Sequence, residues 1–194
     1  MMFHPKRMWA AVVLLAVAAM VQAGCAPQKV TRETVVVFET SKGIVKLSLY
    51  PDVAPKACDN FVKLVRKGYY NGQIFHRVIQ GFMVQTGDPT GTGQGGESAS
   101  GLEFENEVSP SVGFDRAGLL AMANRGPDTN ASQFFITVAP HPELNMKYTI
   151  FGEVKEGYEA IADLSVTPVD ANFRPLSEQK VYKAYIEGSG FSLG

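Results

Sequence analysis

Short apolar runs that alternate with polar residues recur along most of this chain, and each run ends at a cluster of turn-forming residues. Two β-rich runs joined at "TSKG" occupy residues 34–50. Further strand-like runs follow, at residues 118–124, 132–138, 147–154 and 180–188. Such closely spaced short strands are typical of antiparallel all-β folds.

Only two segments have the spacing of an amphipathic helix. In residues 51–68, Phe61 and Leu64 share one predicted helix face with other apolar side chains, and Gly68 is placed to end the helix. Residues 156–164 form the second, shorter pattern. Many strands and two helices predict a mainly β fold, either a barrel or a sandwich, whose open ends the helices cover.

Composition and motifs exclude several classes of function. The net charge is −1 and no cluster of Lys and Arg forms a basic stripe, so nucleic acid is not expected as a main partner. His76 and His141 belong to no metal-binding motif, and the sequence lacks a G-x-S-x-G elbow. The glycine-rich residues 91–101 lead into "LEFENE" rather than a helix, so they predict a flexible surface loop, not a phosphate cradle. No metal or other cofactor is expected.

The first 24 residues are typical of an export signal. Lys6 and Arg7 precede an apolar run of twelve residues at 10–21. This run is too short to cross a bilayer core of about 30 Å comfortably, but it suits the core of a signal peptide. A membrane anchor kept in the mature protein is the alternative. We predict that residues 1–24 are a signal peptide.

The apolar run ends in "VQAGC", where two small residues come directly before Cys25. This ending resembles the lipobox of bacterial lipoproteins, except that Gln22 stands where those proteins prefer an aliphatic residue. The resemblance implies that Cys25 becomes the lipidated first residue, so that acyl chains anchor the protein to a bacterial membrane. Ala26 then favours the periplasmic face of the outer membrane, and residues 25–33 form the lipidated N-terminus and a short polar linker.

Cys58 is the other cysteine, and lipidation of Cys25 leaves it without a partner for a disulfide. It lies on the predicted helix at 51–68, beside apolar residues and far in sequence from any histidine. We therefore interpret Cys58 as a small buried hydrophobe rather than a nucleophile.

The stretch "GQIFHRVIQGFMVQTGD" at residues 72–88 places Arg77 and Gln85 among the most apolar residues of the chain. Taken alone, the large apolar side chains here favour an ordinary core. The polar residues Arg77, Gln85, Asn124 and Gln133 remain conspicuous, because none of them belongs to a common catalytic set. They indicate binding, or a chemistry that needs no nucleophile, base or metal.

Three segments carry a resemblance to a known family: "FHRVIQGFMVQTGD" at 75–88, "AMANRGPDTNASQFFIT" at 121–137 and "FGEVKEG" at 151–157. They are similar to the cyclophilin family of peptidyl-prolyl isomerases, and the likeness spans about residues 34 to 187. The resemblance implies a closed eight-stranded antiparallel β-barrel capped by two α-helices. The isomerase domain would occupy residues 34–188, followed by a C-terminal tail at 189–194.

The same resemblance implies an activity, namely faster rotation about X-Pro peptide bonds without a cofactor or covalent intermediate. The expected partners are proline-containing polypeptides, here unfolded or flexible exported proteins, and the membrane is contacted only through the lipid. Nothing in the sequence suggests more than a monomer. A non-catalytic chaperone module that binds proline-containing peptides is the alternative, but a pure binder has no need of Arg77.

The resemblance assigns catalysis to Arg77, as a hydrogen-bond donor to the prolyl nitrogen. It implies that the substrate is held by a set of groove residues, namely Phe82, Met83, Gln85, Ala123, Asn124, Gln133, Phe135, Leu144 and Tyr148. By strand alternation, we expect His76 to face away from Arg77 and Phe134 to point into the core. The rotation needs no base, so we interpret His76 as a supporting structural residue or a residue at the edge of the groove.

Two positions depart from the common cyclophilin pattern. Glu143 stands where many members have tryptophan, which implies weak inhibition by cyclosporin-type ligands. Tyr148 stands where many members have histidine, which implies an altered substrate preference with retained activity.

Overall fold

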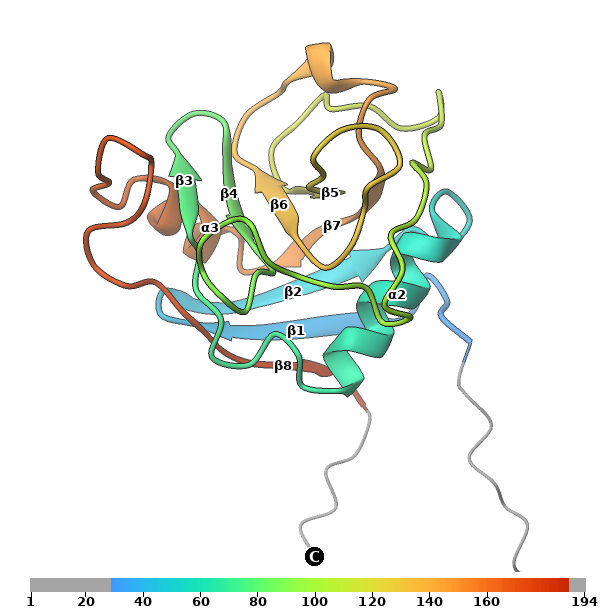
Figure 1. Cartoon of the computed structure of the whole chain (residues 1–194), viewed down its shortest axis with the longest axis horizontal. Helices are drawn as coiled ribbons and strands as arrows, with labels where there is room; N and C mark the ends of the chain where they lie inside the picture. The colour runs from blue at the N-terminus through green and yellow to red at the C-terminus, as the bar shows by residue number, and fades with distance from the viewer. Residues whose placement is uncertain (1–28, 189–194) are drawn as a thin grey trace, which may run out of the picture.

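Eight antiparallel strands form one curled sheet in the computed structural model, which describes residues 29–188 (Figure 1). The strands are β1 (Val35–Thr40), β2 (Gly43–Leu49), β3 (Arg77–Ile79), β4 (Met83–Thr86), β5 (Leu119–Met122), β6 (Phe134–Thr137), β7 (Ile150–Glu156) and β8 (Val181–Ile186). The helical elements are α2 (Pro55–Arg66), α3 (Tyr158–Ser165) and the 3-10 turn η2 (Pro142–Leu144). The predicted signal peptide, Cys25 and the C-terminal tail lie outside the described residues.

Local sequence explains the first elements. The predicted hairpin is confirmed, since β1 pairs with β2 and Thr40 lies opposite Gly43 at the turn. The predicted helix at 51–68 is α2, and Gly68 ends it with a positive φ of 68° and an N–H bond to the Val65 carbonyl. The start of α2 is capped from outside, because the Glu107 carboxylate accepts hydrogen bonds from two backbone N–H groups of its first turn.

The expectation of a closed barrel is wrong, because the sheet is open between its edge strands. Its order is β3-β4-β6-β5-β7-β2-β1-β8, and β3 is only three residues long. On the outer edge of β3, the Val78 N–H bonds to the Phe173 carbonyl at 2.8 Å, so the loop before β8 takes the place of a strand. Just before the two edge strands, one bridge joins Ile74 to Lys180.

Two apolar clusters lie on opposite faces of the sheet. The main core fills the inside of the curl, where Phe61 of α2 packs against Phe134 and Phe151 with ring centroids 5.2 Å apart in each case. The second cluster, on the other face, includes Met83 and Phe135. Strand alternation on β6 therefore sends Phe134 inward, as predicted, and its neighbour Phe135 to the opposite face.

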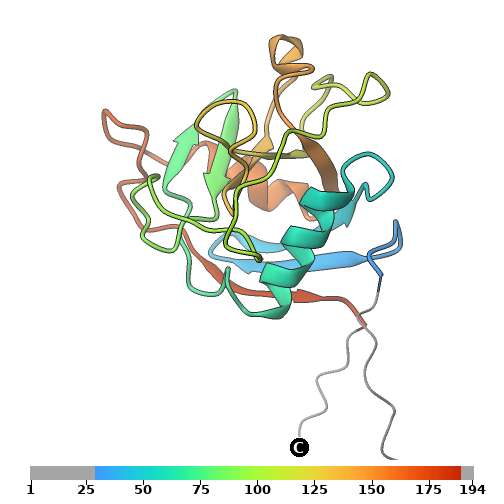
Figure 2. The ribbon, with the colours of Figure 1, turned by 45° about the vertical axis from the view of Figure 1, so that its right-hand side comes forward.

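The two predicted helices lie at different parts of the sheet. α2 packs against β7 and β8, whereas α3 packs against β2, β3 and β4 (Figures 1 and 2). Cys58 of α2 is buried, as expected, and burial raises the pKa of its thiol to about 12. None of the helices within residues 29–188 is long and apolar enough to span a membrane.

Candidate active site

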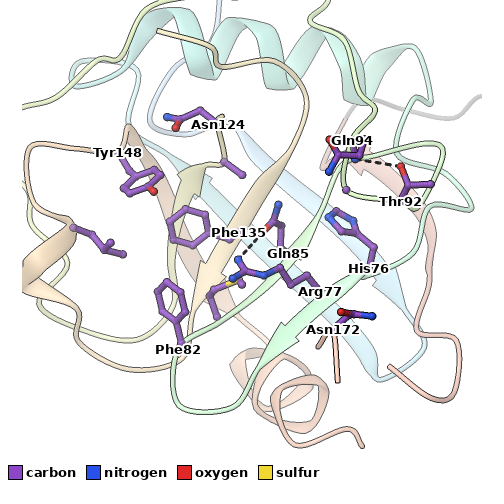
Figure 3. A pocket seen from close by; sticks show the side chains of 14 residues that line it. His76, Arg77, Phe82, Gln85, Thr92, Gln94, Asn124, Phe135, Tyr148 and Asn172 are labelled. Carbon is purple, nitrogen blue, oxygen red and sulfur yellow. Dashed lines mark hydrogen bonds between the residues drawn. The ribbon is translucent and has the colours of Figure 1, made fainter. Parts of the chain in front are cut away.

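A cavity of about 410 Å³ opens on the face of the sheet that carries the second apolar cluster (Figure 3). Nearly all of the groove residues expected from the sequence line it together with Arg77. The lining comprises His76, Arg77, Phe82, Met83, Gln85, Thr92, Gly93, Gln94, Ala123, Asn124, Phe135, Leu144, Tyr148 and Asn172. Among residues 29–188, no group of acidic, histidine or cysteine side chains is placed to hold a metal ion.

One side of the cavity is apolar. Met83 and Phe135 are only 1% and 5% exposed, because they are anchored in adjacent strands β4 and β6. Phe82 and Tyr148 stand on either side of Phe135, with ring centroids 6.4 and 5.8 Å from it. Leu144, from η2, completes this side. The arrangement forms a rigid aromatic cradle for a small apolar ring.

Arg77 lies at the edge of this cradle and reaches toward it (Figure 3). The register of β3 on β4 places Arg77 opposite Gln85, and the Arg77 Nη1 group donates to Gln85 Oε1 at 3.4 Å. Gln85 Nε2 in turn donates to Gln133 Oε1 at 2.8 Å. No carboxylate within residues 29–188 forms an ion pair with Arg77, so its charge is not neutralised by a neighbour.

The residues that directly follow β5 in the sequence form another part of the cavity rim. Ala123 is held by its N–H bond to the Gln133 carbonyl at 3.0 Å, and the Asn124 amide bonds to Asn106 and Asn130. Gln133 itself does not line the main cavity. It lines a smaller adjoining cavity of about 70 Å³, which shares Gln85, Gly93, Ala123 and Asn124 with the main cavity.

His76 lies elsewhere than the alternation of a strand predicts, because β3 begins only at Arg77. Its ring lines the cavity edge, and a Cβ atom at Gly93 would come within 3.4 Å of it. Neither ring nitrogen bonds to any of the described residues. Burial lowers the pKa of His76, Asp88 opposes this, and the charges of Arg174 and Arg77 lower it further. The net effect favours the neutral form of the ring.

Four residues of the cavity lining were not expected from the sequence. Thr92, Gly93 and Gln94 come from the glycine-rich loop, and Asn172 comes from the loop between α3 and β8 (Figure 3). The run of glycines was a usable signal, because glycine permits close approach of a backbone to a ligand. Asn172 carried no signal, since only the folded chain brings its loop to β3.

The glycine-rich loop is fastened to a buried carboxylate. Asp88 is fully buried and accepts hydrogen bonds from the backbone N–H groups of Thr90, Thr92, Gly93 and Gly95, at 2.7 to 3.1 Å. The Thr90 hydroxyl adds a further bond at 2.8 Å. Burial by itself raises the pKa of Asp88, but the hydrogen bonds outweigh burial and lower this pKa to about 2.

Acid should therefore weaken the fold through Asp88. Its folded pKa of about 2 lies below the unfolded value, so its contribution of about 2 kcal/mol is fully present above about pH 4 and is lost as pH falls toward 2. Urea unfolding of wild type and Asp88→Asn should give a difference in unfolding free energy that shrinks over this pH range. A difference that stays constant would contradict the expectation.

Comparisons with known proteins agree with this geometry. Residues 35–186 match the family model described as cyclophilin type peptidyl-prolyl cis-trans isomerase. The human peptidyl-prolyl cis-trans isomerase-like 1 is 52% identical over 153 residues, which cover 79% of this chain and 92% of that protein. Its counterpart in Aspergillus fumigatus is 51% identical over 157 residues, covering 81% and 98%.

Solved structures give the same result. A cyclophilin-type isomerase of Cryptosporidium parvum superposes with a TM-score of 0.78 at 42% identity, covering 81% of this chain and 99% of that one. A structure of the same protein in the presence of the dipeptide Ala-Pro gives a TM-score of 0.76 at 44% identity, covering 78% and 98%. The chain thus belongs to the family of cyclophilin-type peptidyl-prolyl cis-trans isomerases.

Proposed function

We propose that this isomerase accelerates rotation about X-Pro bonds in exported polypeptides, with Arg77 as its catalytic residue. Amide resonance sets a barrier of about 18–20 kcal/mol to this rotation. Uncatalysed exchange of X-Pro bonds therefore takes about tens to hundreds of seconds. No bond is made or cut, so the reaction needs only groups that bind the twisted transition state better than the planar ground state.

The observation that carries the proposal is the position of Arg77 at the edge of the aromatic cradle. As the peptide bond twists, the prolyl nitrogen becomes pyramidal and gains a lone pair that can accept a hydrogen bond. A guanidinium suits this task, because it is always charged, has five N–H donors and is more weakly hydrated than an ammonium. Gln85 occupies only one side of the Arg77 group, at 3.4 Å, so other donors can face a substrate.

The remaining groove residues have complementary roles. We assign the proline ring to the apolar side of the cavity, where Phe82, Met83, Phe135, Leu144 and Tyr148 surround it. The Ala123–Asn124 segment would pair with the substrate backbone, while Gln85 lines both cavities and Gln133 lines the smaller one. The study of a relative with the dipeptide Ala-Pro is consistent with a proline-containing ligand.

The direct test follows cis-trans exchange of a peptide with one Ala-Pro bond, by NMR exchange spectroscopy, with and without the protein. We expect acceleration that is proportional to enzyme concentration. A protein that binds the peptide without accelerating exchange would instead be a proline-peptide-binding module.

The N-terminus is the basis of our proposal for the location of the protein. Residues 1–34 precede the segment that matches the family model, and they contain the signal-like run and "VQAGC". These features support export of a bacterial lipoprotein whose Cys25 carries lipid at the periplasmic face of the outer membrane. The isomerase would then act there, as a monomer, on exported proteins that are not yet folded.

Mass spectrometry of the mature protein, purified from membranes of a bacterial host, tests this location. We expect the mature protein to begin at Cys25 and to carry the added mass of the acyl chains. In a Cys25→Ala variant, we expect neither the lipid nor cleavage before residue 25. A product that starts elsewhere without lipid would refute the lipoprotein proposal and leave the isomerase assignment untouched.

A further inference from the structure

A continuous chain of hydrogen bonds joins Arg77 to the glycine-rich loop. The first bond runs from Arg77 Nη1 to Gln85 Oε1 at 3.4 Å (Figure 3). The second runs from Gln85 Nε2 to Gln133 Oε1 at 2.8 Å. Gln133 Nε2 then donates to two loop carbonyls, those of Gly93 at 3.0 Å and Gly95 at 2.7 Å. This series of hydrogen bonds therefore begins at the cavity edge and ends on the loop backbone.

The two loop carbonyls determine which group donates and which accepts in every hydrogen bond of the series. Carbonyl groups only accept hydrogen bonds, so they require the NH₂ end of Gln133 and leave its oxygen facing Gln85. That oxygen requires the NH₂ end of Gln85, whose own oxygen then faces the guanidinium. Arg77 can only donate, so this is the one orientation of the two amides that gives every group a partner.

Asp88 holds these carbonyls in place. Its Oδ2 atom accepts hydrogen bonds from the N–H groups of Gly93, at 2.7 Å, and Gly95, at 3.1 Å, the same two glycines whose carbonyls meet Gln133. There is no room for a side chain at Gly95, because a Cβ atom there would clash with Asp88 Oδ1 and Thr90. The loop is thus wrapped around the carboxylate.

We infer that Asp88 is a positioning residue for the isomerase reaction, which it serves by holding the loop carbonyls that orient Gln133, Gln85 and Arg77. The inference rests on the proposed catalytic role of Arg77. Asp88 lines neither of the two cavities, and the loop backbone and two amide side chains connect it to the guanidinium. Its carboxylate is required because a neutral amide presents only one oxygen and adds N–H donors opposite the loop N–H groups.

Loss of the carboxylate would loosen the loop backbone. The Gln133 amide could then turn and present its NH₂ end to Gln85, whose NH₂ end would in turn face the guanidinium. Two donors would oppose each other, so Arg77 would leave its orientation. A misplacement of about 1 Å can cost about 100-fold in rate even when the residue changed is far from the reacting atoms.

The test is a double-mutant cycle on kcat, measured by the Ala-Pro exchange assay on the full chain. Asp88→Asn should lower kcat by about 10-fold or more and change KM much less, because the apolar cradle is intact. In an Arg77→Ala background the same substitution should have little further effect, since no guanidinium remains to be misplaced. The side-chain amide resonances of Gln85 and Gln133 should also shift in Asp88→Asn.

A stability control is the buried truncation Val36→Ala in β1, which should lower the free energy of unfolding without lowering kcat of the folded protein. Because Asp88→Asn could fail to fold, Thr90→Val supplies a milder change. Thr90 is an exposed residue whose hydroxyl donates to Asp88, and its replacement should also lower kcat, by a smaller factor.

Two results would overturn the inference. One is a folded Asp88→Asn or Thr90→Val protein with wild-type kcat, and the other is an equal fractional loss with and without Arg77. Failure of the proposed function looks different, because Arg77→Ala would then itself retain wild-type kcat. Suppose instead that Arg77→Ala lowers kcat, and that the double variant loses kcat by the product of the two single factors. In that case only the positioning role of Asp88 is wrong.

Discussion

Replacing Arg77 by alanine should lower kcat/KM for an Ala-Pro peptide by about 100- to 1,000-fold, or about 2.7–4 kcal/mol, the range found when one transition-state hydrogen-bond donor is removed. The loss should lie mainly in kcat, because the lone pair on the prolyl nitrogen exists only in the twisted state. The fold should persist, since Arg77 is partly exposed and its side chain forms one long hydrogen bond, of 3.4 Å to Gln85, within residues 29–188.

Arg77→Lys separates charge from geometry. Lysine keeps the positive charge but replaces the planar set of donors by a strongly hydrated ammonium, so it should recover little of the lost activity. Arg32→Ala is a control for the loss of a guanidinium, because Arg32 is exposed and pairs with Asp52 outside the cavity lining. If Arg77→Ala kept most of the wild-type kcat/KM, the catalytic role would be wrong.

The sequence patterns predicted the local elements well, for physical reasons that are local themselves. The hairpin of β1 and β2 follows from alternation around "TSKG", and α2 follows from apolar spacing closed by Gly68. Closure of the sheet into a barrel is different, because it depends on which segment of the chain pairs with the outer edge of β3. The Phe173 carbonyl takes the Val78 N–H, and no local pattern in the loop before β8 indicates that it does so.

The site was predictable where the family motif is continuous and unpredictable where it depends on loops. Arg77 and Gln85 lie opposite each other because β3 and β4 form a tight hairpin within one motif. The glycine-rich residues 91–101 were expected to be a flexible surface loop, and their side chains at Thr92 and Gln94 are indeed exposed. Composition could not reveal that one buried carboxylate, Asp88, gathers the N–H groups of this loop.

Phe134 and Phe135 are adjacent on β6 and should respond to truncation in different ways. Phe134→Ala should lower the free energy of unfolding by about 3–5 kcal/mol, as is usual for a buried phenylalanine. Its ring is 1% exposed and packs against Phe38, Phe61 and Tyr70 in the main core. The kcat/KM of the protein that remains folded should stay close to the wild-type value, because this ring does not line the cavity.

Phe135→Ala should have the opposite effect, with a large loss of kcat/KM and a smaller loss of stability. Its ring stacks on Phe114 at 6.1 Å and forms a wall of the cavity, so water can enter the space that it leaves and the loss of stability should be smaller. A proline ring would lose about 1.5–3 kcal/mol of apolar burial, which is roughly a 10- to 160-fold loss in kcat/KM, mostly through KM. Urea unfolding and the exchange assay on both variants measure the two effects separately. Similar losses of kcat/KM in both variants would show that Phe135 is ordinary core, because only a residue that holds the substrate should uncouple activity from stability in this way.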